Sequence, residues 1–388
     1  MMNRQVLQIV AALLCAASAV WAGTTYYAAP DGGVDSDCLS PSTAGTLSNA
    51  LSRTVSAKRW DAGDTVIVAP GDYRFDHTFS LTKNYLTVRS TSADPGDVQF
   101  IGGGTNNRFR AFSLTGPCLF QGFTITNFSL GDTGFAVTCT PQVEGVAVFT
   151  NCVIRNCIGY NAGNQYRYGA CSKGIYRNCA FLYNTNNMTF GSAGALNGAT
   201  AERCTFVGHY AYAGGAMGGG SATDCFFTNN VGHLREGGAC NGVGTLTRCD
   251  FIDNRTLRLN GGGVSGGKAF DCRFLYNKSA GGGGGTYKAD TVNCLFVGND
   301  AGTSVFALGG GAQEGTHTNG VFASNSAYKG GALSGATIQD ASSRTTTAAT
   351  AAPPNRPRPS ARSFSGTRRP ISASATAARS VTASSSAT

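Results

Sequence analysis

A short pattern of apolar and polar positions recurs between residues 152 and 325. Each copy has a cysteine, a phenylalanine two residues later and an asparagine three residues after the phenylalanine, as in Cys179, Phe181 and Asn184. Alternation with period two predicts a short β-strand whose cysteine and phenylalanine point to the same side. We therefore expect both side chains to line an interior. The cysteines of this pattern are Cys152, Cys179, Cys204, Cys225, Cys249, Cys272 and Cys294.

The phenylalanines and the asparagines of the pattern form two further series. In stacked copies we expect each series to form a ladder, with the asparagine amides at a turn bonding the backbone of the next copy. His209 takes the place of one asparagine, Gly320 takes the place of a cysteine, and the first copy is shortened, with Asn156 as its asparagine. The phenylalanines are Phe181, Phe206, Phe227, Phe251, Phe274, Phe296 and Phe322, and the asparagines are Asn184, Asn230, Asn254, Asn277, Asn299 and Asn325.

The spacing of the copies predicts the architecture. They follow one another at steps of 21 to 27 residues, and a glycine cluster such as Gly237–Gly238 precedes each cysteine. One copy cannot bury its own apolar face, so the copies must stack. The sequence therefore predicts an all-β fold, a right-handed parallel β-helix solenoid of roughly 10–13 coils, with glycines at turns that need positive φ. A β-propeller is the rival repeat architecture, but its blades need about 40 residues or more.

Changes of composition divide the chain into four segments. Residues 1–22 have the pattern of an export signal, because a basic residue precedes an apolar stretch and a small-residue cleavage site. We expect residues 23–64 to form an N-terminal cap that leads into the first coil, and residues 65–340 to form the β-helix. Residues 341–388 are dominated by Ala, Ser, Thr, Pro and Arg. Two interpretations of this tail stay open, a disordered low-complexity segment or a shifted reading frame.

Two sets of sequence words carry a family resemblance. FLYN, FTNN, FIDN, FVGN and FASN, together with GGA, resemble the repeats of the polymorphic outer membrane protein family, autotransporter adhesins with β-helical passengers. GDTVIVAPGDY, at residues 63–73, resembles the first coil of pectin-lyase-like β-helices. The resemblance covers about residues 24–340. It implies a β-helix and, through the adhesins, a place at or beyond a bacterial surface.

The distribution of charge argues against a nucleic-acid partner. The net charge is +9, but the last 48 residues contain seven arginines and no acidic residue. Without those seven and Arg4, 22 of the 30 basic residues remain against 21 acidic ones, so the predicted β-helix is close to neutral. Nucleic-acid binding needs basic charge clustered on the folded domain. We therefore expect no nucleic-acid partner.

The cysteines allow two interpretations. One of the fourteen lies in the expected export signal, which leaves an odd number, thirteen, in the mature chain. Ladder neighbours would stand about 4.8 Å apart with parallel side chains, an awkward geometry for a disulfide. Buried thiols are therefore favoured, and disulfides are the alternative. No CxxC pair occurs and the four histidines are scattered, so we expect no metal site. Five cysteines lie off the ladder and are candidates for pairing: Cys118, Cys139, Cys157, Cys171 and Cys240.

A column of alternating charge precedes the ladder cysteines. Arg203, Asp224, Arg248 and Asp271 occupy the same position in successive copies. In stacked coils these side chains would form an outward ladder of ion pairs, and such opposite-charge neighbours contribute about 0.2–1 kcal/mol each. The structural interpretation is the favoured one. A charged groove for a uronic-acid polymer is the functional alternative.

Catalytic motifs do not stand out along the chain. β-Helix lyases need a base and a group that neutralises the substrate carboxylate, and hydrolases need paired carboxylates at a defined separation. Neither constellation occurs as a recognisable motif. Charged residues that coils could bring together are Arg155, Arg177, Arg235, Glu236, Asp253, Arg255 and Arg258. Tyrosines that could stack on sugars, or simply occupy exposed turns, are Tyr160, Tyr166, Tyr168, Tyr183, Tyr210 and Tyr212.

These observations predict an exported β-helix repeat protein with a surface adhesion, binding or structural role and no recognisable catalytic site. The alternative is a polysaccharide lyase, or another carbohydrate-active enzyme, that acts on an acidic polysaccharide. We expect no cofactor in the first case and calcium in the second. The expected partner is a polysaccharide or a ligand at a host or cell surface. The chain is expected to be secreted or at the cell surface, and not to span a membrane once the signal is removed.

Overall fold

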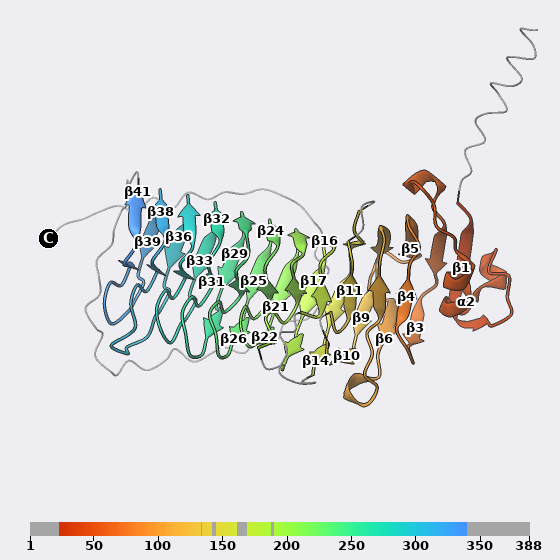
Figure 1. Cartoon of the computed structure of the whole chain (residues 1–388), viewed down its shortest axis with the longest axis horizontal. Coiled ribbons are helices and arrows are strands. Elements are labelled where there is room, and N and C mark those ends of the chain that lie inside the picture. Colours follow the sequence, from red (N-terminus) through yellow and green to blue (C-terminus); the bar gives the residue numbers. More distant parts are fainter. Residues whose placement is uncertain (1–22, 133, 142–144, 161–168, 188–189, 340–388) are drawn as a thin grey trace, which may run out of the picture. The chain divides into compact units, whose positions relative to one another are not determined.

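The computed structural model describes residues 23–132, 134–141, 145–160, 169–187 and 190–339. The expected export signal, the tail, Tyr166 and Tyr168 lie outside these residues. The described chain is an all-β parallel β-helix of about ten turns with very little helix (Figure 1). The fold class predicted from the repeat is therefore confirmed.

Four parallel sheets make up the β-helix. Sheet 1 has 13 strands, from β1 (Thr25–Gly33) to β41 (Thr337–Gln339). Sheets 2 and 3 have 11 strands each. Sheet 2 runs from β3 (Gly71–Arg74) to β39 (Val321–Ala323), and sheet 3 runs from β4 (Phe79–Leu81) to β40 (Leu333–Ser334). Sheet 4 has six strands, from β10 (Ser129–Leu130) to β30 (Arg255–Thr256).

One coil visits the four sheets in a fixed order. For example, the chain passes through β16 (Ile175–Arg177) of sheet 1, β17 (Ala180–Leu182) of sheet 2, β18 (Thr185–Asn186) of sheet 4 and β19 (Leu196–Asn197) of sheet 3. In sheet 2 the register pairs the phenylalanines of successive copies directly, and the steps between paired residues are the 21 to 27 residues read from the sequence. Equivalent residues therefore stack in columns along the β-helix.

The N-terminal segment supplies most of the helical part of the structure. Helix α2 (Leu47–Arg53) begins after Thr46, whose hydroxyl accepts a hydrogen bond from the Asn49 N–H. Its buried face, Leu47, Ala50 and Leu51, joins the core. Three short 3-10 turns are η1 (Pro41–Thr43), η2 (Trp60–Ala62) and η3 (Gly104–Asn106). Strand β1 pairs in parallel with β2 (Thr65–Val68), so the expected cap segment already contributes the first strand of sheet 1.

The phenylalanines of the repeat form one continuous buried stack. From Phe181 to Phe322, successive ring centroids lie 4.5–5.0 Å apart with interplanar angles of 3–10°. Their relative exposures are 0–4%. This spacing follows the separation of hydrogen-bonded strands, about 4.8 Å, so the sheet register itself sets the stacking distance. The stack removes the largest side chains of each coil from water and is the main apolar contribution to cohesion between coils.

The asparagines of the repeat form a buried hydrogen-bonded ladder. The amide oxygen of Asn254 accepts from the backbone N–H of Asn230 at 3.0 Å and from the Asn230 amide at 2.8 Å. The Asn254 amide nitrogen donates to the carbonyl of Phe227 at 2.9 Å. The same contacts recur through Asn277, and onward to the last copy. Each amide thus satisfies backbone groups of the preceding coil that would otherwise be buried without partners.

The first copy of the repeat has its full length, so the interpretation of it as a shortened copy was wrong. The backbone N–H of Cys157 donates to the amide oxygen of Asn184 at 2.9 Å, so Cys157 occupies the asparagine position of its coil. Asn156 instead sits one residue earlier, at φ 52°. Asparagine adopts this left-handed conformation more readily than most residues, which explains an asparagine next to, but outside, the ladder.

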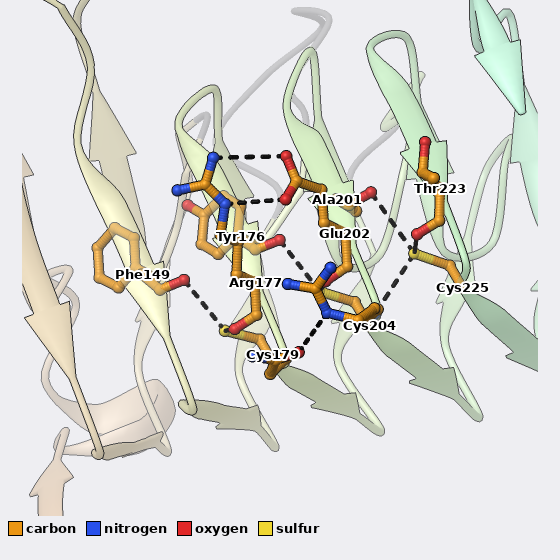
Figure 2. Close-up of polar contacts among 11 residues, drawn as sticks. Phe149, Tyr176, Arg177, Cys179, Ala201, Glu202, Cys204, Thr223 and Cys225 are labelled. Atoms are coloured by element: carbon orange, nitrogen blue, oxygen red, sulfur yellow. Dashed lines mark hydrogen bonds and ion pairs between the residues drawn. The ribbon is translucent and has the colours of Figure 1, made fainter. Parts of the chain in front are cut away.

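The ladder cysteines bond the backbone in the same manner (Figure 2). The Cys204 thiol donates to the carbonyl of Tyr176 at 3.3 Å, and its backbone N–H donates to the sulfur of Cys225 at 3.3 Å. The Cys225 thiol donates to the carbonyl of Ala201 at 3.6 Å. All thirteen cysteines of the described residues are buried and unpaired. Burial raises the pKa of Cys179 well above its ordinary value, so this group is a protonated donor rather than a nucleophilic thiolate.

The glycine clusters permit close approach between coils. In Gly237–Gly238–Ala239, the first glycine has φ 79°, a conformation that residues with a Cβ rarely adopt. A Cβ added to Gly238 would lie 1.9 Å from the carbonyl oxygen of Gly262 in the next coil. The second glycine of the cluster is therefore required by the distance between stacked backbones.

Candidate functional site

The column of residues before the ladder cysteines is built of left-handed turns. Its members have φ of 50–56°, and the column contains asparagines as well as charged residues. These turns end the strands of sheet 1 and aim the following cysteine into the core. The members are Asn151, Asn178, Arg203, Asp224, Arg248, Asp271 and Asn293.

The expected ladder of ion pairs forms in part. Arg248 and Asp224 make a bidentate pair, with nitrogen–oxygen distances of 2.7 and 2.9 Å, and the bonded guanidinium lowers the pKa of Asp224. Arg203 instead donates to the amide oxygen of Asn178 at 2.8 Å. Asp271 accepts from the Asn293 amide at 3.0 Å. Among the described residues the column thus contains one ion pair, because the neighbouring asparagines engage the charges at both ends.

Other ion pairs join neighbouring coils beside this column. Arg177 and Glu202 pair at 2.8 Å on the outward face of sheet 1, as Figure 2 shows. Arg273 and Asp250 pair one position after the ladder cysteines. These charges face one another rather than a common groove. They stabilise the stack modestly, since exposed ion pairs contribute about 0–1 kcal/mol.

A pocket of about 300 Å³ lies where three coils turn between sheets 4 and 3. Several of its lining residues lie in the turns that follow β22 (Tyr210–Ala211) and β26 (Val231–Gly232), and one lies at the end of β27 (Cys240–Asn241). We call it the Tyr212 pocket. Its lining residues are Phe190, Ser192, Tyr212, Ala213, Arg235, Glu236 and Asn241.

Aromatic rings and one guanidinium define this pocket. Phe190 meets the Tyr212 ring edge-on at 5.4 Å. Arg235 donates through Nε to the Tyr212 hydroxyl at 3.2 Å, and its guanidinium carbon lies 6.0 Å from the ring centroid. His233 meets Tyr212 edge-on at 5.9 Å and stacks on Tyr210 at 4.8 Å with an interplanar angle of 8°. The rings hold one another in place, so the polar groups of Arg235 are presented from a fixed surface.

The pocket contains the groups that recognise an acidic sugar. Aromatic rings cover the apolar C–H face of a pyranose, and a guanidinium binds a carboxylate or sulfate through paired N–H donors. Glu236 and Asn241 add acceptors and donors for hydroxyl groups. Its volume falls at the lower end of the usual range for small-molecule pockets, about 300–1,000 Å³. The arrangement can bind one end or one repeat of a saccharide.

Basic side chains continue from the pocket along sheet 4. Parallel register and isolated bridges place Thr185, Tyr210, Val231, Arg255 and Lys278 in one outward column. Arg255 and Lys278 are exposed, and neither forms an ion pair within the part of the chain that the structure describes. The column continues from Lys278 to Asp300, so its two adjacent cations are followed by one carboxylate. The adjacent pair of cations favours a negatively charged partner.

The charged residues singled out in the sequence are not all brought together. Arg155 bonds the side chain of Gln99 and lies apart from the pocket, while Arg177 is engaged by Glu202. Arg235 and Glu236 do line the pocket. Arg255 lies in the basic column, while Asp253 sits in a left-handed turn at φ 53°.

Several functional candidates escaped the sequence reasoning. Phe190, Ser192, His233 and Asn241 line or support the pocket, but none belongs to the repeated pattern. One signal was available. Tyr212 and Arg235 are separated by 23 residues, the length of one coil, which predicts that they are stacked neighbours.

A second pocket, of about 520 Å³, lies near the first coils. Asp72, Arg74, Asp76 and His77 line part of it, and Asp76 accepts a hydrogen bond from His77 at 2.5 Å. Its acidic and basic groups are mixed, so it selects no single class of ligand by charge. Within the described residues no group of three or more His, Cys, Asp or Glu is placed to hold a metal ion. Among those same residues we find no helix with the length and apolar character needed to cross a membrane.

Comparison with known proteins finds likeness at the level of the fold. No protein-family model matches the chain, and no curated protein matches it either. Among solved structures, a rhamnogalacturonan lyase is 13% identical, with 74% of this chain and 84% of that chain covered and a TM-score of 0.41. The pectate lyase Pel9A is 13% identical, with 85% and 80% covered and a TM-score of 0.37.

An adhesin is among the similar structures as well. The surface protein and adhesin PfbA of Streptococcus pneumoniae matches with 10% identity, coverage of 77% of this chain and 94% of that chain, and a TM-score of 0.30. These chains share a parallel β-helix with the present one. At such identities the likeness concerns architecture, and function must be argued from the site.

Proposed function

We propose that this chain is an exported β-helix protein that binds an acidic polysaccharide on its outer surface without degrading it. The observation that carries the proposal is the Tyr212 pocket, in which Arg235 is bonded to an aromatic wall, with the basic column beside it. Export rests on the pattern of residues 1–22. The resemblance of the repeats to those of surface adhesins supports a location at or beyond a bacterial surface.

The chemistry of the pocket favours binding over structural packing alone. An arginine in a coil turn could bond a carbonyl or a carboxylate of its own chain, as Arg177 bonds Glu202. Arg235 bonds the hydroxyl of Tyr212 and lines a pocket that also contains Glu236 and Asn241. A carboxylated sugar supplies the negative charge, the hydroxyl groups and the apolar ring face that complement this lining.

The proposal is tested by calorimetric binding with polygalacturonate and alginate as probes and dextran as the neutral comparison. We expect the mature chain to bind at least one acidic polymer, more weakly as salt rises, and not to bind dextran. A hydrogen bond to a charged group contributes about 1.5–3 kcal/mol, so Arg235→Gln should weaken binding about 10- to 100-fold. Arg74→Gln is the matched control, because it removes the same charge from the other pocket.

Two results would count against this function. Equal affinity for dextran and for the acidic polymers would remove the role of charge. Equal weakening by Arg235→Gln and Arg74→Gln would show that net charge, rather than the Tyr212 pocket, governs binding.

The second candidate is a polysaccharide lyase acting on the same class of polymer. The contact between Arg235 and the Tyr212 hydroxyl favours it, because a lyase needs a proton acceptor close to a cation that neutralises the substrate carboxylate. Calcium would be the expected cofactor, yet the described residues offer no group of three or more ligands for it. Absorbance at 235 nm with polygalacturonate or alginate decides between the two, since a lyase forms an unsaturated product and a binding protein does not.

A further inference from the structure

Two exposed tyrosines occupy a backbone conformation that bulky residues avoid. Tyr183 has φ 54° and Tyr276 has φ 57°, and 60% and 52% of their surfaces are exposed. Aromatic residues are genuine outliers in this left-handed region, whereas Asn, Asp and Gly adopt it more readily. An unfavourable conformation at an exposed aromatic residue points to a role outside the fold.

Both tyrosines belong to one column, the residues that immediately precede the ladder asparagines. Backbone hydrogen bonds between successive coils fix this column. We call it the turn column. Its members from the first copy onward are Asn156, Tyr183, Gly208, Asn229, Asp253, Tyr276, Gly298 and Ser324.

Each tyrosine lies against a glycine of the next coil. A Cβ added to Gly208 would lie 2.6 Å from Cδ1 and 2.7 Å from Cε1 of Tyr183, and the distances from Gly298 to Tyr276 are the same. The words FLYN and then FVG occur at both places. A side chain at either glycine would displace the ring, so the pairing of tyrosine with glycine builds a flat aromatic surface twice.

The two surfaces are aligned along the direction in which the coils stack. Tyr183 and Tyr276 are separated by four coil steps, about 19 Å at about 4.8 Å per step. Exposed Asn229 and Asp253 stand between them. The basic column of sheet 4, with Arg255, runs two residues further along each coil. Aromatic and polar groups, with the carboxylate of Asp253 among them, therefore follow one line beside the basic column.

We propose that Tyr183 and Tyr276 are stacking platforms for an acidic polysaccharide that runs along the stacking direction of the coils. A pyranose in an extended chain advances by about one coil spacing, so the platforms engage only a chain of about five or more residues. This inference rests on the proposed function and deepens it. The Tyr212 pocket would bind one sugar unit, while the platforms select a polymer over a short oligosaccharide.

The test replaces both tyrosines with asparagine, which the turn column already contains at Asn156 and Asn229. Tyr183→Asn with Tyr276→Asn keeps a side chain suited to positive φ, as at Asn229, so the double variant should fold with an unchanged or higher thermal midpoint. We expect its affinity for polygalacturonate or alginate, whichever the wild type binds, to fall at least about tenfold. Affinity for the corresponding trisaccharide should not change. Tyr328→Asn is the matched control, an exposed tyrosine outside the turn column.

The outcomes separate this inference from the proposed function. Wild-type affinity of the double variant for the polymer overturns the platforms, even if Arg235→Gln abolishes binding. Loss of polymer binding in the double variant, with Arg235→Gln unaffected, supports the platforms and overturns the pocket. If the wild type binds neither polymer, both proposals are overturned.

Discussion

His209 shows how a ladder position accepts a different side chain without losing its hydrogen bonds. Its Nδ1 accepts from the backbone N–H of Asn184 at 3.1 Å, and its Nε2 lies 3.1 Å from the carbonyl of Phe181. Its own backbone N–H donates to the amide oxygen of Asn230 at 3.1 Å. These contacts assign the neutral ring with the proton on Nε2. Burial lowers the pKa of His209 to about 4.

The low pKa makes stability depend on pH. Above about pH 6.5 the ring is neutral in both the folded and the unfolded chain, and its contribution is complete. Between about pH 6.5 and 4 the unfolded chain takes up the proton first, so the free energy of unfolding falls by about 3 kcal/mol. His209→Asn restores the residue of the other copies and should remove this part of the slope. Urea unfolding between pH 4 and 8 measures it, with His317 as a second buried histidine whose lowered pKa leaves a residual slope. An identical pH slope in the variant would show that His209 is protonated equally in both states.

At the scale of the strand, the elements of sheet 2 within the repeat share one arrangement at their ends. A left-handed residue ends the preceding strand, and an inward thiol or amide then bonds the backbone of the coil before it, as in Asp224 with Cys225 and Asn229 with Asn230. Three-residue strands such as β25 (Phe226–Thr228) have few ladder bonds of their own. The side-chain ladders make up for this by satisfying buried groups at both ends of such strands.

Two positions of one coil require glycine for different reasons, so alanine variants of the two form a matched pair. Gly238→Ala would force a Cβ to within 1.9 Å of the Gly262 carbonyl, and backbone cannot move aside as a flexible side chain can. We expect a loss of about 3 kcal/mol or more in the free energy of unfolding. Gly242→Ala meets nothing within 4 Å but keeps φ 62°, so its cost should be about 1–2 kcal/mol. Chemical denaturation of both variants checks this, and equal costs would mean that dihedral strain, not contact between coils, decides.

The strand-level features were predictable to the extent that they repeat. The period of two in CxF and the steps of 21 to 27 residues were enough to predict the stacked phenylalanines and the buried amides. The pattern could not show that Cys157, not Asn156, takes the amide position, because the choice depends on which N–H faces inward. Nor could charge alternation predict that Asn178 and Asn293 would engage the ends of the charge column. The Tyr212 pocket depends on turns of irregular length, which carry no period.

At the scale of the whole described β-helix, cohesion depends on contacts between consecutive coils. Each strand pairs with the equivalent strand of the coils before and after it, as Phe251 pairs with Phe227 and Phe274. Stability in such an array is close to a sum over coils and their interfaces. Stacked rings join the coils from Phe181 to Phe322, side-chain ladder contacts continue to Asn325, and the thiol ladder runs from Cys152 to Cys294. A covalent link between coils is therefore not needed to explain why they stay in register.

Thiol chemistry tests this account across the β-helix, because all thirteen described cysteines are buried and none forms a disulfide. Burial raises the pKa of Cys139 and Cys157 to about 12, which suppresses the reactive thiolate as well as access. The folded mature chain should therefore leave Ellman's reagent nearly colourless, and denaturation without reductant should release thirteen reactive thiols. Intact mass should be the same before and after reduction. A gain of two mass units per bond on reduction, with fewer reactive thiols, would reveal disulfides. The ladders would then be only part of what holds the coils together.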